Sequence, residues 1–137
     1  MKRKPMRSKF AVLFFLLILL AACASGPVTP KAGHWEGSNP DVSFNITAEG
    51  MLTNFSMQAP YGARDCNITI ASLSMPEPGR LLIDLTSTES LSTGYISGDF
   101  SAEKISGKFK IDMCNMNISL MPDDAEARDW AAEWKNP

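Results

Sequence analysis

The sequence predicts a mainly β protein: a single antiparallel β-sandwich or small β-barrel of about six to eight strands, with a short C-terminal helix. Three observations lead to this prediction. Apolar and polar residues alternate with a period of two along most of residues 41–120. Clusters rich in Gly, Pro, Asp and Ser separate the alternating runs, as turns separate strands. After Pro122 the apolar period changes to that of a helix.

Residues 1–22 are expected to be a signal peptide rather than part of the fold. Five basic residues and no acidic ones precede Phe10, and residues 10–22 form an unbroken apolar run. A helix over these thirteen residues would span about 20 Å, which is short of the ~30 Å hydrocarbon core of a bilayer. This pattern is typical of a cleaved leader rather than a membrane-spanning helix.

The string Leu20-Ala21-Ala22-Cys23 resembles the lipobox of bacterial lipoproteins. The resemblance implies that the Cys23 thiol receives a diacylglycerol and that cleavage makes Cys23 the new amino terminus. Ala24 follows, where an Asp would indicate retention in the inner membrane, so the outer membrane is the expected destination. Acyl chains at ~0.8 kcal/mol per buried CH₂ would then hold the protein on the periplasmic side of that membrane. An ordinary secretory signal with an incidental Cys23 is the alternative.

Residues 24–33 are rich in Gly, Pro and small polar residues, and predict a flexible tether between Cys23 and the domain. The domain is expected over residues 34–137. The string Gly33-His34-Trp35 at its start is similar to the Gly-x-Trp of lipocalin-like barrels, in which the Trp closes one barrel end. The remaining chain is short for a full eight-stranded calyx with ordinary loops.

The expected strands follow the alternation. Each has apolar residues at every second position and polar residues between them; they cover residues 41–47, 51–57, 66–73, 81–85, 95–100, 105–113 and 114–120. The last of these is either a separate strand or the end of the one before it. Residues 59–65 and 75–79 are expected to be loops, since both contain Gly and Pro.

Cys66 and Cys114 are expected to form a disulfide. Export places them in an oxidising compartment, and Cys23 is consumed by lipid, so one pairing remains among the three cysteines. Each of the two lies on the apolar face of its predicted strand. Two free buried thiols, or a redox-active pair, are the alternatives, although the chain contains no Cys-x-x-Cys.

Residues 123–135 are expected to form the C-terminal helix. Ala127, Trp130, Ala131 and Trp134 fall on one helical face, acidic residues precede them, and Lys135 lies near the end. The two indoles would either pack against the sheet or remain exposed to bind a partner.

Composition limits the chemistry. Without residues 1–22 the chain has 8 Lys and Arg against 15 Asp and Glu, so its charge is 8 − 15 = −7. An acidic domain is repelled by phosphate backbones, so no nucleic-acid partner is expected. The one His and the scattered cysteines suggest no metal site, no cofactor and no catalytic residue. His34 beside Glu36 is a poorly preorganised pair on an extended segment, so an enzyme is the least favoured class.

Two classes of function remain, a binding or assembly module and a small-ligand or inhibitor module. Size, lipobox, β pattern and disulfide are similar to pilotins, small lipoproteins that escort secretin subunits of type II or type III secretion systems. In that case the protein is a non-catalytic binding or assembly module for an envelope protein partner, and an apolar groove with walls at Phe55, Tyr61, Trp130 and Trp134 would receive a helix. The alternatives are a lipocalin-like carrier of small ligands and a lysozyme inhibitor, whose acidic charge would attract a basic lysozyme.

Overall fold

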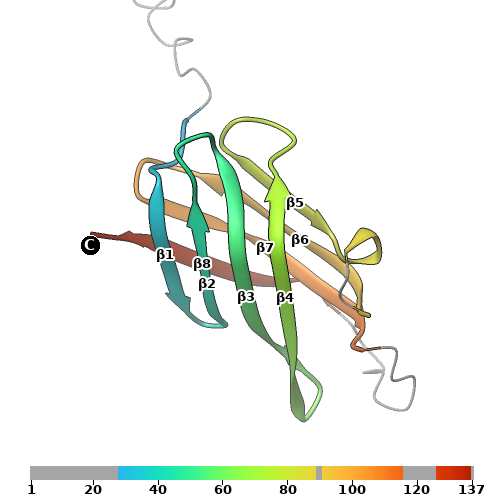
Figure 1. Cartoon of the computed structure of the whole chain (residues 1–137). Helices are drawn as coiled ribbons and strands as arrows, with labels where there is room; N and C mark the ends of the chain where they lie inside the picture. The colour runs from blue at the N-terminus through green and yellow to red at the C-terminus, as the bar shows by residue number, and fades with distance from the viewer. Residues whose placement is uncertain (1–27, 89–90, 116–125, 137) are drawn as a thin grey trace, which may run out of the picture.

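The computed structural model describes residues 28–88, 91–115 and 126–136 (Figure 1). The expected signal peptide and Cys23 lie outside the described residues. So do residues 116–120 of the last expected strand and residues 123–125 of the expected helix. No helix in the described ranges is long and apolar enough to cross a bilayer.

Eight strands form one antiparallel sheet, and a single turn of 3₁₀-helix, Leu85–Ser87, follows the fifth strand. The strands are β1 Gly33–Ser38, β2 Asp41–Ile46, β3 Met51–Tyr61, β4 Arg64–Ser74, β5 Arg80–Asp84, β6 Thr93–Phe100, β7 Lys104–Met113 and β8 Arg128–Lys135. Their order in the sheet is β4-β3-β2-β1-β8-β7-β6-β5. The prediction of a mainly β, antiparallel fold is therefore confirmed.

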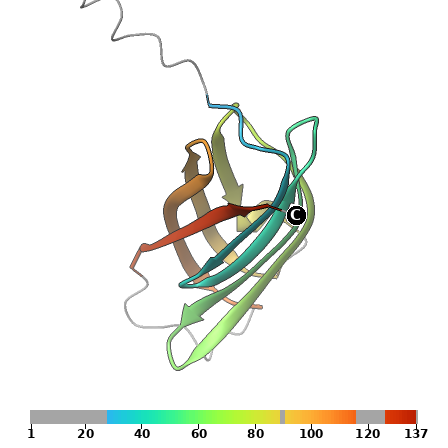
Figure 2. The ribbon, with the colours of Figure 1, turned by 90° about the vertical axis from the view of Figure 1, so that its left-hand side faces the viewer.

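The sheet curls into a half-barrel built from two meanders. Strands β1–β4 form one half and β5–β8 form the other, and Figure 2 shows the two halves facing each other across the interior. The halves join where β8 pairs with β1 over three residue pairs. β4 and β5 are the two edges of the sheet, and no ladder joins them in the described ranges.

The period-2 alternation produces this shape because every strand turns its apolar residues to the inside of the curl. Trp35 of β1, Phe44 of β2 and Phe55 of β3 are almost completely buried there. Trp35 stacks on Phe44 with ring centroids 5.9 Å apart, and meets Phe100 of β6 edge-on at 5.2 Å. Such aromatic pairs stabilise a core beyond the area that they bury. Trp35 therefore links the two halves, and packed rings occupy the interior.

The expected C-terminal helix is wrong for the residues that the structure describes, because Arg128–Lys135 is strand β8. Trp130, Ala132 and Trp134 lie at every second position and face inward, so the same tryptophans also fit a strand. β8 pairs with β7 on one side and with β1 on the other. A helix would have left the backbone groups on those two edges without these partners, so the sheet overrides the local preference.

One expected loop is shorter than predicted, whereas residues 75–79 connect β4 to β5 as expected. Residues 59–65 are mostly strand, because β3 continues to Tyr61 and β4 begins at Arg64. Gly62 takes a positive φ of 61° in the turn between them, a conformation that glycine adopts without strain. Pro60 has no N–H group to donate. It lies beyond the last residue pair between β2 and β3, so no hydrogen bond to β2 is lost there. β1 is a full strand, where only an extended entry segment was expected.

Candidate functional site

Cys66 and Cys114 form the predicted disulfide, which is confirmed with a Cα–Cα distance of 5.9 Å. Cys66 belongs to β4 and Cys114 directly follows β7, so the bond links the two halves of the sheet. The buried Ser92 lies beside it: its Oγ is 3.7 Å from Cys66 Sγ and accepts a 3.1 Å hydrogen bond from the backbone N–H of Asn115. The disulfide is a buried crosslink.

The four side chains expected to line a partner groove lie inside the fold. Phe55, Tyr61 and Trp130 are buried, and Trp134 is partly buried against the same core. Each polar tip has a backbone partner: the Tyr61 hydroxyl donates to Asp112 O at 3.3 Å, and Trp130 Nε1 donates to Ser97 O at 2.8 Å. The predicted apolar groove is therefore not formed by these residues, because the curl turns them toward the core.

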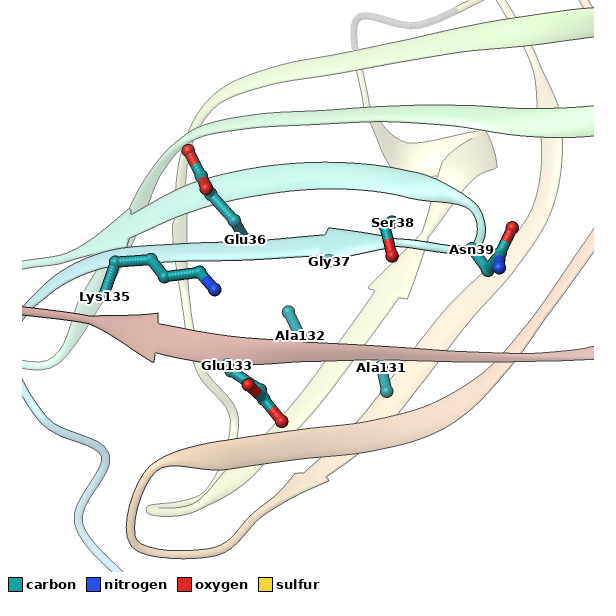
Figure 3. A pocket seen from close by; sticks show the side chains of 8 residues that line it. All are labelled: Glu36, Gly37, Ser38, Asn39, Ala131, Ala132, Glu133 and Lys135. Atoms are coloured by element: carbon teal, nitrogen blue, oxygen red, sulfur yellow. The ribbon is translucent and has the colours of Figure 1, made fainter.

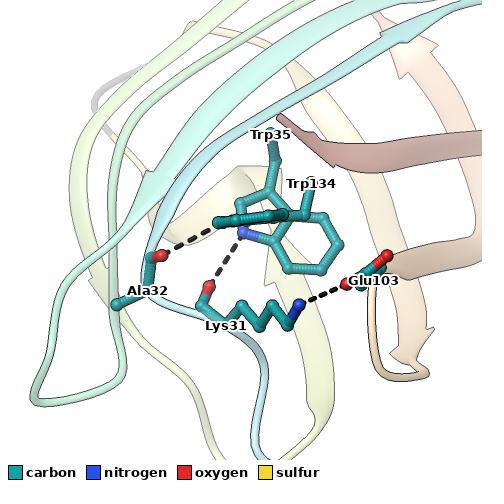
Figure 4. A network of polar contacts seen from close by, with 5 residues as sticks. All are labelled: Lys31, Ala32, Trp35, Glu103 and Trp134. Carbon is teal, nitrogen blue, oxygen red and sulfur yellow. Dashed lines mark hydrogen bonds and ion pairs between the residues drawn. The ribbon is translucent and has the colours of Figure 1, made fainter. Parts of the chain in front are cut away.

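The segment that enters β1 is fixed to the end of the half-barrel by a network that we call the tether clamp (Lys31, Ala32, Trp35, Glu103 and Trp134; Figure 4). Trp35 Nε1 donates to Lys31 O at 3.0 Å, and Trp134 Nε1 donates to Ala32 O at 3.1 Å. The Lys31 ammonium pairs with the Glu103 carboxylate and lies 4.5 Å from the centre of the Trp134 ring, a cation–π arrangement. The chain is thus held in place from Lys31 onward.

A crevice of about 430 Å³ lies where β1 and β8 meet (Figure 3). Its lining combines charged, neutral polar and very small residues: Glu36, Gly37, Ser38, Asn39, Ala131, Ala132, Glu133 and Lys135. Gly37 lets the strands approach, because a Cβ there would collide with the backbone carbonyl of Ala131. Asn39 and Ala131 also line a neighbouring hollow that extends over β7. We call the first hollow the β1–β8 crevice.

The register of β1 and β8 places like charges opposite each other at this crevice. Glu36 faces Glu133, and His34 faces Lys135, an arrangement that destabilises a sheet unless other charges compensate it. Neighbouring side chains compensate the two carboxylates: Lys104 of β7 for Glu133, and His34 of β1 for Glu36. Glu133 lies 3.0 Å from the Lys104 ammonium, and Glu36 lies 2.9 Å from His34 Nε2.

These contacts shift the pKa values of Glu133 and His34. The pKa of Glu133 is lowered, chiefly because Lys104 donates a hydrogen bond to the carboxylate. The pKa of His34 is raised, first by the hydrogen bond to Glu36 and next by the one to Asn45, whose Oδ1 is 2.9 Å from Nδ1. A protonated ring donates to both oxygens. The crevice therefore offers the carboxylates of Glu36 and Glu133, the ammonium group of Lys135 and neutral polar groups at Ser38 and Asn39, which suits binding to a polar, mixed-charge surface.

Sequence reasoning found His34 and Glu36 as neighbours but missed Ser38, Asn39, Glu133 and Lys135. The alternation of residues 128–135 could have indicated the last two of these, because in a strand Asp129, Ala131, Glu133 and Lys135 share one outward face. In a helix these four residues would not share a face. Within the described ranges, no group of three or more His, Cys, Asp or Glu is arranged to hold a metal ion. No family model, curated protein or solved structure matches the chain.

Proposed function

We propose that this protein is a bacterial lipoprotein, anchored to the outer membrane through a lipidated Cys23, and that it acts in the periplasm as a non-catalytic binding module for an envelope protein partner. The Cys66–Cys114 disulfide carries this proposal. Disulfides form and persist in oxidising compartments, which supports export of the chain. The pairing also leaves Cys23 as the one cysteine outside the bond, and the lipobox resemblance falls on that residue.

The β1–β8 crevice is the surface that we assign to the partner. Its floor is made of small residues, so a partner can approach the backbone closely there, while Glu36, Glu133 and Lys135 supply charge around it. Within the protein itself, Glu133 pairs with the Lys104 ammonium and Glu36 contacts the His34 ring. Charge complementarity between two partners governs the specificity and the rate of their association more than its strength.

A small-ligand carrier is the weaker alternative. Carriers of the lipocalin type hold their ligand inside the barrel. Here the inside of the curl is filled by stacked and edge-on aromatic rings from Trp35, Phe44, Phe55 and Phe100. A ligand entering this space would have to displace well-packed side chains, at a cost comparable to that of a core substitution.

A secretin subunit is the first partner to test, in line with the pilotin resemblance. Full-length acylated protein would be used to capture a secretin subunit from a detergent extract of the envelope. Capture should fall sharply with Glu36→Lys in the β1–β8 crevice. Asp99→Lys is the matched control, because Asp99 is an exposed acidic residue that pairs with Arg80 on the outer side of β6, away from the crevice.

Mass spectrometry of the purified protein tests the anchor separately. It should find a diacylglycerol and an acyl chain on Cys23 as the first residue, and Cys23→Ser should leave the membrane fraction. A first residue without lipid contradicts the lipoprotein proposal. Equal capture by the two charge-reversal variants contradicts the assignment of the crevice.

A second candidate, a lysozyme inhibitor, is favoured by the charge of one half of the sheet. Strands β1–β3 contain no Lys or Arg, whereas Glu36 and Asp41 lie on their outer face. Such a surface attracts a strongly basic enzyme. Measuring the activity of a basic lysozyme with increasing amounts of the protein tests this candidate, and unchanged activity removes it.

A further inference from the structure

We infer that the end of the half-barrel at which the chain enters lies against the lipid surface, through a group of exposed apolar residues that we call the tether-end rim. The rim consists of Val28, Ala48, Met51, Pro76 and Pro78. The inference rests on the proposed lipidation of Cys23 and adds to it a second, non-covalent contact with the bilayer.

The length of chain outside the described structure limits the distance. Five residue steps separate Cys23 from Val28, and five residues span at most about 17 Å. A lipidated Cys23 lies at the level of the headgroups, because its acyl chains are in the hydrocarbon. Val28 therefore lies no farther than about 17 Å from that level, even with the tether fully extended.

The domain cannot swing away freely from Val28, because this part of the chain is already packed. A Cβ on Gly79 would collide with the carbonyl of Val28, so the two backbones are in contact. Three residues later the tether clamp fixes Lys31 and Ala32 to the two tryptophans. The short tether therefore presents one particular end of the half-barrel to the membrane.

Two turns flank the chain at that end. Figure 1 shows the β2–β3 turn and the β4–β5 loop beside the entering segment, and Figure 2 shows them at the same end of the half-barrel. Val28 and Met51 are 40% and 39% exposed, and they are two of the four large apolar side chains exposed in the described ranges. A hollow of about 420 Å³ opens among these turns, with Pro30, Met75 and Pro78 in its lining.

The charges of the two turns set the depth of contact. Glu49 and Glu77 are exposed at the tips, beside Ala48 and Pro78. Burying an ionised carboxylate in hydrocarbon is very costly, so the rim lies among the headgroups and does not insert further. This leaves the β1–β8 crevice on the side of the domain, where a periplasmic partner can reach it.

Two variants, each with one added free cysteine on the same strand and the same face, test the inference. Met51→Cys lies on the rim, and Gln58→Cys lies seven residues farther along β3, about 23 Å away. Both positions are exposed and outward-facing. The full-length acylated variants would carry a thiol-linked fluorophore in phosphatidylcholine vesicles that contain a lipid with a quencher on its headgroup. The probe at position 51 should lose most of its emission, and the probe at position 58 should keep most of it.

The possible outcomes separate the inference from the proposal on which it rests. Acylated Cys23 with equal quenching at the two positions, or stronger quenching at position 58, overturns the inference and leaves the lipoprotein proposal standing. Mass spectrometry that finds Cys23 without lipid overturns both. Quenching at position 51 that persists when Cys23→Ser protein is merely mixed with the vesicles shows a rim that binds lipid by itself, which supports the inference.

Discussion

The two halves of the sheet bury similar inner faces but carry opposite kinds of outer face. Strands β1–β4 contain eleven Ser, Thr, Asn or Gln residues and a single Lys or Arg, Arg64. Strands β5–β8 contain three Ser or Thr residues and six Lys or Arg residues. In the second half, cross-strand pairs such as Lys104–Glu133 and Lys108–Asp129 line the surface. The fold thus constrains the inward positions, while the outward positions differ freely between the halves.

Of the contacts that join the halves, three are joints that can be tested directly. One is the core around Trp35, a second is the Cys66–Cys114 bond, and a third is the short β1–β8 ladder. The ion pairs of β5–β8 and the His34 cluster of β1–β2 are local to one half. Changes at the joints should therefore destabilise both halves together, and changes on the outer faces should have small effects.

Trp35→Ala should have the largest effect. The side chain is fully buried between Phe44 of one half and Phe100 of the other. Its removal should lower the free energy of unfolding by about 3–5 kcal/mol, as for other large-to-small core changes. Urea denaturation measures this change. Leu82→Ala, at an exposed position of β5, is the control and should stay within about 0.5 kcal/mol of the parent protein.

Removing the disulfide should come next. The double variant Cys66→Ala/Cys114→Ala opens a crosslink that spans 48 residues. The chain-entropy account predicts a loss of about 4 kcal/mol. Thermal unfolding followed by circular dichroism gives the comparison. A melting temperature unchanged from that of the oxidised protein would show that the halves hold together without this joint.

Gly37→Ala tests the β1–β8 joint. The new Cβ would collide with the carbonyl of Ala131, so the strands must separate or shift. Overpacking of this kind should cost about 1–3 kcal/mol. The neighbouring Ser38→Ala, which adds no atom at an exposed site, is the matched control in the same urea titration. Equal free energies of unfolding for the two variants would mean that β1 and β8 can accommodate a Cβ at position 37 without strain.

The ion pairs of β5–β8 should make the effect of a surface substitution on stability depend on salt in this half of the sheet. Lys108 lies 2.7 Å from Asp129, and both side chains are exposed. Lys108→Ala should therefore cost only about 0.2–1 kcal/mol, and the difference should shrink as salt screens the pair. Ser56→Ala on β3, which contains no charged residue, should show no comparable dependence on salt. Denaturation midpoints at low and high sodium chloride give both values.

The smallest effect should be the pH dependence due to His34. Its pKa in the folded protein is raised above 6.5 by Glu36 and Asn45. The stabilisation is therefore fully present below the unfolded pKa and is lost as pH rises through the folded value. The melting temperature of the parent protein minus that of His34→Gln should fall slightly across this window. A difference that grows with pH would contradict the assigned direction.

The inner face could be read from the sequence because it depends only on local alternation. Phe44, Ile68, Ile83 and Phe109 were placed inward by their period, and all are buried. The facing of Cys66 and Cys114 followed from the same alternation, whereas their pairing followed from the expected export of the chain and the expected lipidation of Cys23. The β1–β8 crevice could not be read in the same way, because it exists only where two segments a hundred residues apart meet.

The C-terminal segment shows where local pattern stops being sufficient. Ala127, Trp130, Ala131 and Trp134 satisfy a helical period, while Trp130, Ala132 and Trp134 satisfy a strand period. The sequence by itself determined which faces are apolar, the inward direction of the two cysteines and the charge of each strand. The tertiary structure decided that Arg128–Lys135 is a strand between β1 and β7 and that Phe55, Tyr61 and Trp130 face the core. The physical reason is that the backbone hydrogen bonds of this segment to β1 and β7 outweigh its local preference between helix and strand, which is nearly balanced.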